Sequence, residues 1–228
     1  MIYLPVSMKV GNHAPRIGRP RAFNPEVALE KALQVFWRRG YAGASLSELT
    51  AAMGITRPSL YAAFGNKEEL FHKALDLYMR GLANGSREAL RERTARAVVE
   101  DLLHRLVALL SDPRHPAGCL LVKGGLSSAK ADDPIRNEMI KRRLAGEDAL
   151  RERFERAKAE GDLPANSDPA GLAFYVTTIT QGMTVQAVNG TDENELRRLV
   201  EMVLQTWPSL VESSDQRAFD STVRGEKP

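Results

Sequence analysis

The sequence predicts an all-α protein of about nine helices, in which an N-terminal three-helix domain is followed by a larger helical domain. Apolar residues recur at spacings of three and four over most of the chain, which is the period of a helix with one buried face. Residues that cap helices precede these segments, and glycine or proline follows several of them. No segment shows a strand-like alternation of comparable quality.

The composition is that of a globular protein with a packed core, since 43% of the 228 residues are hydrophobic and 27% are charged. The single cysteine, Cys119, excludes an intramolecular disulfide and fits a reducing compartment, so we expect the protein in the cytoplasm. The apolar first residues lack the basic region, the long apolar run and the cleavage site of a signal peptide. No segment approaches the length of a membrane span, so no membrane contact is expected.

Basic residues gather at the N-terminal end, although the net charge is only +3. Residues 1–67 contain nine Lys or Arg and three Asp or Glu, against 23 basic and 26 acidic residues in the remainder. A basic end attracts polyanions, but a merely solvated basic tail would have the same composition. Residues 1–20, rich in glycine, proline and arginine, predict a flexible basic arm, and Arg16, Arg19 and Arg21 lie in it or directly after it without an acidic neighbour.

The first helix is predicted to begin after Asn24, a good N-cap that is followed by proline at the first helical position. It is expected to end at Gly40, because glycine readily adopts the left-handed conformation that follows a helix. The segment Ser45–Glu48 has the pattern of a capping box, in which the serine hydroxyl and the glutamate carboxylate each satisfy a backbone donor. It predicts a second helix that ends at Gly54.

A third, very short helix is predicted at Arg57–Phe64 with Thr56 as its cap. With the cap it is about 13 Å long, so it needs a neighbouring helix to hold it in place. Asn66, with a glutamate three residues further on, caps a fourth helix that is expected to run through Met79.

The second and third helices have the geometry of a helix-turn-helix. The third helix directs Arg57, Ser59 and Tyr61 away from Leu60 and Phe64, which face inward one turn apart. Such a helix can enter a major groove of DNA, whereas an ordinary helical corner would contain the same two short helices.

The stretch RGYAGASLSELTAAMGITRPSLYAAFGNKEELFHKAL, which begins at Arg39, closely resembles the DNA-binding domain of the TetR family of transcriptional repressors. The shared features are Gly-Tyr at the end of the first helix, the capped second helix, the Gly-Ile-Thr turn, the Leu-Tyr-x-x-Phe pattern and the Gly-x-Lys-Glu-Glu-Leu that follows it. The resemblance covers roughly residues 21–75. It implies a DNA-binding domain at residues 21–67, with the helix-turn-helix motif at 45–64.

The resemblance implies which side chains hold DNA. Arginine can bond both acceptors of guanine, hydroxyl groups are permissive, and helix N-termini favour phosphate. For Ser45, which the resemblance places at a phosphate, the role as a helix cap would be a sufficient explanation by itself. For Lys67, also placed at a phosphate, the alternative is a lysine that is simply solvated. The basic arm is either a minor-groove contact or simply disordered. The residues implied are Thr56, Arg57 and Ser59 near the base edges, Ser45, Tyr61 and Lys67 at phosphates, and Arg16, Arg19 and Arg21 in the arm.

Residues 68–210 are predicted to form a helical domain for effector binding and dimerisation, and the polar tail 211–228 is predicted to be disordered, with no role assigned. The helices expected in the larger domain are Ala89–Leu110, Ala117–Ala129, Pro134–Glu160, Pro169–Val188 and Glu193–Trp207.

The last two of these helices are strongly apolar. The eighth is apolar almost throughout, and the ninth has an apolar stripe from Leu196 to Trp207. These surfaces could belong to the core of one chain, but the resemblance implies that helices 168–188 and 192–207 meet those of a second copy in a four-helix bundle. A homodimer would present two recognition helices to successive major grooves of a palindromic operator in double-stranded DNA.

The resemblance also implies an effector pocket, although aromatic residues and methionine at helical spacing are more often plain core. Cys119 stands near a predicted helix start and is either a redox sensor or an inert core residue. His104 and His115 could join it as metal ligands, but no tight ligand spacing supports this, and no metal site or cofactor is predicted. The residues expected to line a pocket are Tyr78, Leu106, Cys119, Phe154 and Tyr175, with Leu110 and Met139 as further candidates.

The sequence therefore predicts a sequence-specific transcriptional regulator, a repressor released from its operator by a small-molecule, metal or redox signal. An activator and a helical scaffold that binds only protein are the alternatives. No enzyme is expected, because the chain lacks the phosphate-binding, dinucleotide-binding, zinc-protease and nucleophile-elbow motifs. The operator sequence, the regulated genes and the identity of the effector stay open.

Overall fold

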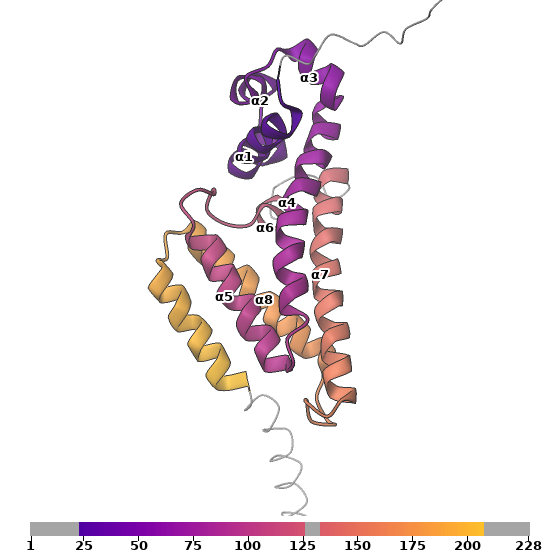
Figure 1. Cartoon of the computed structure of the whole chain (residues 1–228). Helices are drawn as coiled ribbons and strands as arrows, with labels where there is room; N and C mark the ends of the chain where they lie inside the picture. Colours follow the sequence, from indigo (N-terminus) through magenta and orange to yellow (C-terminus); the bar gives the residue numbers. More distant parts are fainter. Residues whose placement is uncertain (1–22, 126–132, 208–228) are drawn as a thin grey trace, which may run out of the picture.

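The computed structural model describes residues 23–125 and 133–207. Within these ranges the chain forms nine helices and no strand, as predicted. Helices α1 to α3 form a small group at one end of the long helix α4, which continues into a body made of α5, α7, α8 and the C-terminal helix (Figure 1). The helices are α1 (Pro25–Gly43), α2 (Leu46–Met53), α3 (Arg57–Phe64), α4 (Lys67–Ala89), α5 (Ala95–Ser111), α6 (Leu120–Gly125), α7 (Pro134–Ala159), α8 (Pro169–Val188) and the C-terminal helix at residues 193–207.

Helix α1 breaks where the sequence predicts. Asn24 Oδ1 accepts a hydrogen bond from the backbone N–H of Glu26 at 2.9 Å. Gly40 has a positive φ of 70° with ψ at 174°, so the regular helix stops there, and a further turn carries the chain to Gly43. The predicted position of the break is confirmed.

The capping boxes differ from the prediction at one of two sites. Ser45 Oγ accepts from the Glu48 backbone N–H at 3.1 Å, but the Glu48 carboxylate pairs with Arg39 instead of returning to the cap. Only half of the expected box therefore forms at α2. At α4 the box is complete, because Asn66 and Glu69 each accept from the other's backbone N–H.

The boundaries around α4, α5 and α6 were predicted wrongly. α4 continues ten residues beyond Met79 to the buried Ala89, so tertiary packing overrides the low helix propensity of the two glycines on the way. α5 begins only at Ala95, where Thr94 Oγ1 caps it by accepting from the Ala97 backbone N–H at 3.1 Å. α6 begins at Leu120 rather than Ala117, and its expected end at Ala129 lies outside the described residues.

A buried arginine closes the end of α4. The Arg153 side chain, on α7, is 4% exposed and donates to the carbonyl oxygens of Leu90 at 3.2 Å and Glu92 at 2.8 Å. These carbonyls follow the last turn of α4 and have no helical partner of their own. Through these hydrogen bonds, Arg153 attaches the turn between α4 and α5 to helix α7.

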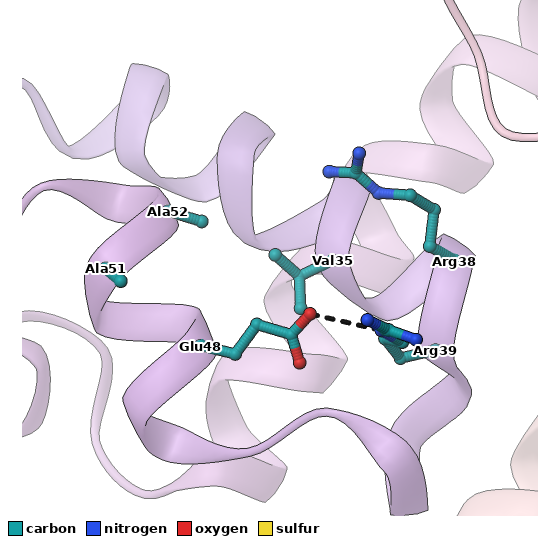
Figure 2. A pocket seen from close by; sticks show the side chains of 6 residues that line it. All are labelled: Val35, Arg38, Arg39, Glu48, Ala51 and Ala52. Carbon is teal, nitrogen blue, oxygen red and sulfur yellow. Dashed lines mark hydrogen bonds and ion pairs between the residues drawn. The ribbon is translucent and has the colours of Figure 1, made fainter.

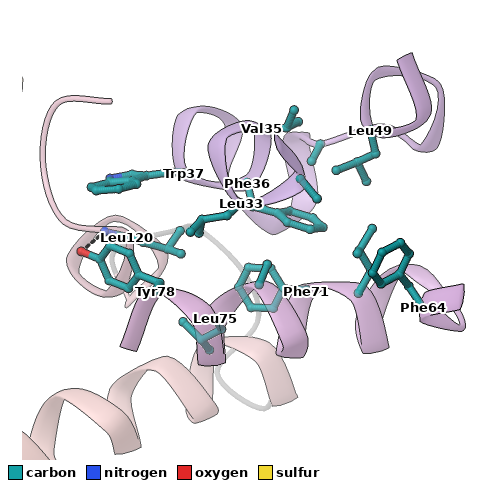
Figure 3. Packing of buried hydrophobic residues seen from close by; sticks show 14 of the residues in the cluster. Leu33, Val35, Phe36, Trp37, Leu49, Phe64, Phe71, Leu75, Tyr78 and Leu120 are labelled. Carbon is teal, nitrogen blue, oxygen red and sulfur yellow. Dashed lines mark hydrogen bonds between the residues drawn. The ribbon is translucent and has the colours of Figure 1, made fainter. Parts of the chain in front are cut away.

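The apolar residues pack into two clusters. The first joins α1, α2, α3, α4, α6 and the start of α7, with the ring of Phe36 edge-on to Phe71 at 5.0 Å between centroids (Figure 3). The second joins α5, α7, α8 and the C-terminal helix, where Phe154 meets Trp207. The first cluster runs across the predicted domain boundary at residue 67, since it includes Leu60 of α3 and Leu75 of α4.

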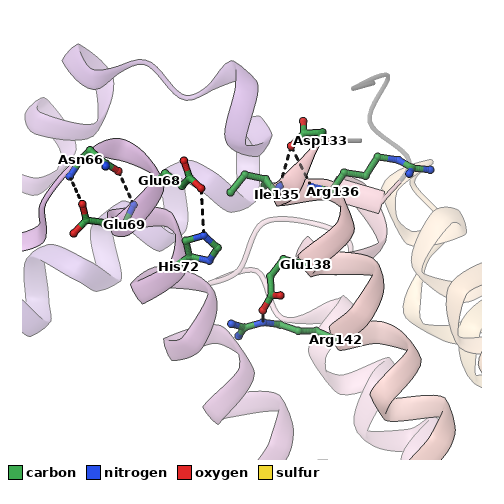
Figure 4. A network of polar contacts seen from close by, with 9 residues as sticks. All are labelled: Asn66, Glu68, Glu69, His72, Asp133, Ile135, Arg136, Glu138 and Arg142. Carbon is green, nitrogen blue, oxygen red and sulfur yellow. Dashed lines mark hydrogen bonds and ion pairs between the residues drawn. The ribbon is translucent and has the colours of Figure 1, made fainter. Parts of the chain in front are cut away.

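Polar contacts join α4 to α7 alongside these clusters. Arg142 lies on α7 and binds Asp76 of α4 and Glu138 of its own helix, each at 2.7 Å. Figure 4 shows the Glu138–Arg142 pair on α7, and in the same view the capping box at the start of α4 and the Asp133 cap of α7. Partly exposed ion pairs contribute little stability each, so they align the two helices rather than hold them together.

Gly118 and Gly146 give a matched test of the backbone. Gly118 has φ at 84°, and a Cβ there would lie 2.5 Å from Val188 Cγ2, so Gly118→Ala should lower the free energy of unfolding by about 1–2 kcal/mol or more. Gly146 lies inside α7, and a Cβ added there would meet no heavy atom within 4 Å, so Gly146→Ala should raise it by about 0.5–1 kcal/mol. Urea unfolding of both variants checks the two signs; a neutral Gly118→Ala would show that the loop rearranges freely.

Candidate nucleic-acid interface

Helix α3 is held by one face and exposes the other. Leu60 and Phe64 are buried, whereas Thr56 and Arg57 are exposed and the Tyr61 side chain is 50% exposed. At about 12 Å this helix is too short to be stable alone, so packing against its neighbours keeps it helical. Its outer face is a rigid, polar projection of the kind that can enter a groove.

Side chains form hydrogen bonds at both ends of α3. Thr56 Oγ1 lies 3.4 Å from the Ser59 backbone nitrogen and 2.9 Å from the Ser59 hydroxyl. At the other end, Lys73 of α4 donates to the Phe64 carbonyl at 2.7 Å, a contact that sequence reasoning missed. A lysine nine residues beyond a helix end, on the next helix, gives no local signal in the sequence.

Arg57 reaches back to the preceding helix. Its Nη2 donates to the hydroxyl of Ser47, in the first turn of α2, at 2.7 Å. Sequence reasoning named Ser45 on this helix and missed Ser47. The structure thus brings α2 and α3 together through an exposed polar contact as well as through the core.

The two residues expected at phosphates on neighbouring helices lie in different settings. Ser45 is exposed and caps α2. Lys67 is half-buried, with Nζ 4.5 Å from the centre of the Tyr41 ring, and desolvation lowers the pKa of its ammonium. Tyr41 thus steadies the lysine at the N-terminal end of α4, where helix dipole and cation both favour an anion.

A shallow hollow lies between α1 and α2, on a part of the helix-turn-helix domain that includes no residue of α3. Figure 2 shows its polar side, where the ion pair of Arg39 and Glu48 spans the two helices at 3.2 Å. The hollow is lined by Val35, Arg38, Arg39, Glu48, Ala51 and Ala52.

The helix-turn-helix group is tied to the rest of the molecule by Trp37. Its indole Nε1–H, on α1, donates to the Gly118 carbonyl at 2.7 Å, and its ring stacks on His115 and meets Tyr78 edge-on. The Tyr78 hydroxyl donates to Cys119 Sγ at 3.2 Å. It also accepts from the Leu120 backbone N–H at 3.3 Å, as Figure 3 shows. Burial raises the pKa of Tyr78 well above its usual value, so the hydroxyl stays a donor.

The residues expected to line an effector pocket fall into two groups. Tyr78 and Cys119 belong to the first cluster and touch each other. Phe154 belongs to the second cluster, and Leu106 and Tyr175 pack against that cluster. Met139 joins the first group and Leu110 the second, so the structure does not gather these residues around one place.

Further sequence-based predictions concern the basic arm, the C-terminal tail, a metal site and a membrane span. Arg16, Arg19, Arg21 and the tail 211–228 lie outside the described residues. In residues 23–125 and 133–207 no group of three or more His, Cys, Asp or Glu could hold a metal ion. Over the same part of the chain, no helix has the length and apolar character needed to cross a membrane.

Two family profiles match the chain. That of the bacterial regulatory proteins of the tetR family matches residues 28–74, and that of the tetracyclin repressor-like C-terminal domain matches residues 94–203. The HTH-type transcriptional repressor ComR of Escherichia coli K12 is 31% identical over 85% of this chain and 93% of its own. The chain belongs to the TetR family.

Solved structures of TetR-family proteins have the same fold. A cysteine-substituted CifR bound to a 26-base-pair operator duplex is 41% identical, with a TM-score of 0.79 over 83% of this chain and all of its own. A TetR regulator from Rhodococcus sp. RHA1 is 38% identical, with a TM-score of 0.56 over 80% of this chain and 99% of its own. The predicted family and fold are confirmed.

The Trp37 hydrogen bond can be tested by comparison with Trp207, the other tryptophan, whose ring packs on Phe154. Each Trp→Phe change removes similar ring area, but Trp37→Phe also leaves the Gly118 carbonyl without its indole donor. We expect Trp37→Phe to lower the free energy of unfolding by about 1–2 kcal/mol more than Trp207→Phe. Equal losses in urea unfolding would show that the indole N–H contributes nothing at this junction.

Proposed function

We propose that this TetR-family protein is a cytoplasmic, non-enzymatic repressor that binds a palindromic operator as a homodimer and is released by a small-molecule, metal or redox signal. The observation that carries the DNA-binding part is the exposed face of α3, with Thr56, Arg57 and Tyr61 projecting from a helix fixed by Leu60 and Phe64. The operator duplex bound by the related CifR and the repressor activity named for ComR support the same function.

The roles within the interface follow from chemistry. Arg57 reads base edges, because a guanidinium can bond the two major-groove acceptors of guanine at once. Thr56 and Ser59 lie beside it, and Tyr61 lies further along the helix, where its hydroxyl binds a phosphate. Ser45 and Lys67 hold phosphates at the N-termini of α2 and α4, which fixes the register of α3 on the duplex.

Arg57 and Tyr61 should differ in what they contribute to binding. Arg57→Ala should weaken operator binding about tenfold or more and relax the preference for particular base pairs. Tyr61→Phe should weaken binding to all duplexes alike, because a phosphate contact carries no sequence information. Gel shifts and selection from random duplexes measure both effects.

Arg151, an arginine on α7, is the matched control for Arg57, and Arg151→Ala should bind DNA as the parent protein does. If neither Arg57→Ala nor Tyr61→Phe affects DNA retention at low salt, the protein is a scaffold rather than a DNA reader. The logarithm of the affinity should also fall with the logarithm of salt concentration, with a slope of about −0.9 per phosphate neutralised.

The dimer surface that we propose lies on the outer side of α8 and the C-terminal helix. The expected stripe on the C-terminal helix, including Leu196 and Trp207, is buried within the chain itself. Other apolar side chains of the same two helices are exposed, among them Phe174 at 64% and Met202 at 63%. Val185 and Val188 continue this exposed face along α8. An exposed apolar surface of this kind typically marks a site of contact with a partner protein.

Phe174 gives the test of the dimer. Phe174→Glu should convert the protein to a monomer in sedimentation velocity and abolish high-affinity operator binding, because a carboxylate cannot be buried unpaired at an interface. Leu144→Glu on α7, where the parent side chain is 48% exposed, is the control and should stay dimeric. A parent protein that sediments as a monomer, or a dimeric Phe174→Glu variant, would contradict this surface.

The junction at Trp37 is where a signal in the larger domain could reach α1. The loop before α6 carries the Gly118 acceptor and Cys119, and both contact side chains of the first cluster. A ligand shifts the protein away from DNA only if it binds the released state more tightly, so its coupling to DNA must be reciprocal. Titration of metals, oxidants and lipophilic compounds into the protein–operator complex identifies the class of signal.

A further inference from the structure

The contact between Arg57 and Ser47 has a role beyond joining two helices. The donor Nη2 and the acceptor Oγ are 2.7 Å apart, and both side chains lie on the exposed side of the helix-turn-helix. The contact spans ten residues of sequence and links α2 to the helix that projects outward. It therefore fixes the direction of the longest polar side chain on the outer face of α3.

Attraction between opposite charges does not explain this contact. The nearest acid in sequence to Ser47 is Glu48, and its carboxylate is held by Arg39 Nε at 3.2 Å. The first turn of α2 is the positive end of the helix dipole, where a cation is disfavoured. The Arg57 guanidinium is thus held by its hydrogen bond to the Ser47 hydroxyl, although the dipole of α2 disfavours a cation at this position.

The other hydroxyl groups at the start of α3 do not orient Arg57. Those of Thr56 and Ser59 lie 2.9 Å apart and bond each other. Neither therefore sets the direction of the arginine, and an exposed arginine has large conformational freedom that must be lost on binding. A preformed contact removes part of that loss before DNA arrives.

We propose that Ser47 is a positioning residue for DNA readout, whose hydroxyl holds the Arg57 guanidinium ready for a base edge. This inference rests on the proposed role of Arg57 as the residue that reads bases. The guanidinium carries five N–H donors, and Ser47 uses a single hydrogen of Nη2. The second Nη2 hydrogen and its neighbour still form a two-donor edge, which matches guanine O6 and N7.

The test is a double-mutant cycle on the full-length protein with Ser47→Ala, Arg57→Ala and the combined variant. Ser47→Ala should weaken binding to the selected operator about threefold to tenfold and relax preference at the same base pairs as Arg57→Ala. In the Arg57→Ala background it should have no further effect. Ser47→Thr keeps a hydroxyl and should restore both affinity and preference.

Controls separate positioning from folding and from direct DNA contact. Alanine is a good helix former, so thermal unfolding of Ser47→Ala should match that of the parent protein. Ser45→Ala, which removes the α2 cap, should instead weaken binding equally with and without Arg57.

Three results would overturn the inference. The first is an equal loss from Ser47→Ala in both backgrounds, which would make Ser47 a DNA contact in its own right. The second is unchanged base preference in Ser47→Ala while Arg57→Ala changes it. The third is an unchanged base preference in Arg57→Ala itself, which would refute the proposed role of Arg57. Because this result is seen in the Arg57→Ala variant alone, it is distinguishable from a failure of the role proposed for Ser47.

Discussion

The short helix α3 depends on its neighbours for its existence. Eight residues cannot hold a helix in water, so the burial of Leu60 and Phe64 is the interaction on which the interface depends. Phe36 of α1 and Phe71 of α4 belong to the same cluster, and the edge-on contact of their rings joins these two helices. Because Leu60 and Phe64 are buried in this cluster, the helix that carries the outward side chains of α3 is anchored to α4.

That same cluster joins the small N-terminal group to the helices that follow it. Leu120 and Ile135, from α6 and the start of α7, belong to it. Trp37 adds a hydrogen bond to the loop before α6, and Tyr78 continues the contact to Cys119. A close-packed interior has low compressibility, so α1 and α6 share one core that links the helix-turn-helix to the loop before α6.

The polar face of the helix-turn-helix is prepared by contacts within the protein. The ammonium of Lys67 is steadied by the Tyr41 ring, and the guanidinium of Arg57 by the Ser47 hydroxyl. Long cationic side chains lose conformational freedom when they bind phosphate or a base. In the DNA-binding role that we propose for them, this ordering lowers the cost of binding and makes affinity depend on the arrangement of α2, α3 and α4.

Sequence alone determined the helices whose ends are marked locally. Asn24 and Thr56 cap helices where the sequence predicts them, because each supplies a side-chain acceptor within three residues of its backbone donor. The exposed face of α3 follows equally from local periodicity. The family resemblance rests on this same contiguous block, which is why it identified the domain.

Only the tertiary structure decided matters that depend on distant residues. Arg153 of α7 contacts the carbonyl of Leu90 just after α4, and Lys73 and Ser47 contact residues of α3 from neighbouring helices. The stripe from Leu196 to Trp207 is buried within the chain, and Phe174 is left exposed. Helical period tells which residues share a face, but what covers that face is fixed by packing between segments far apart in the chain.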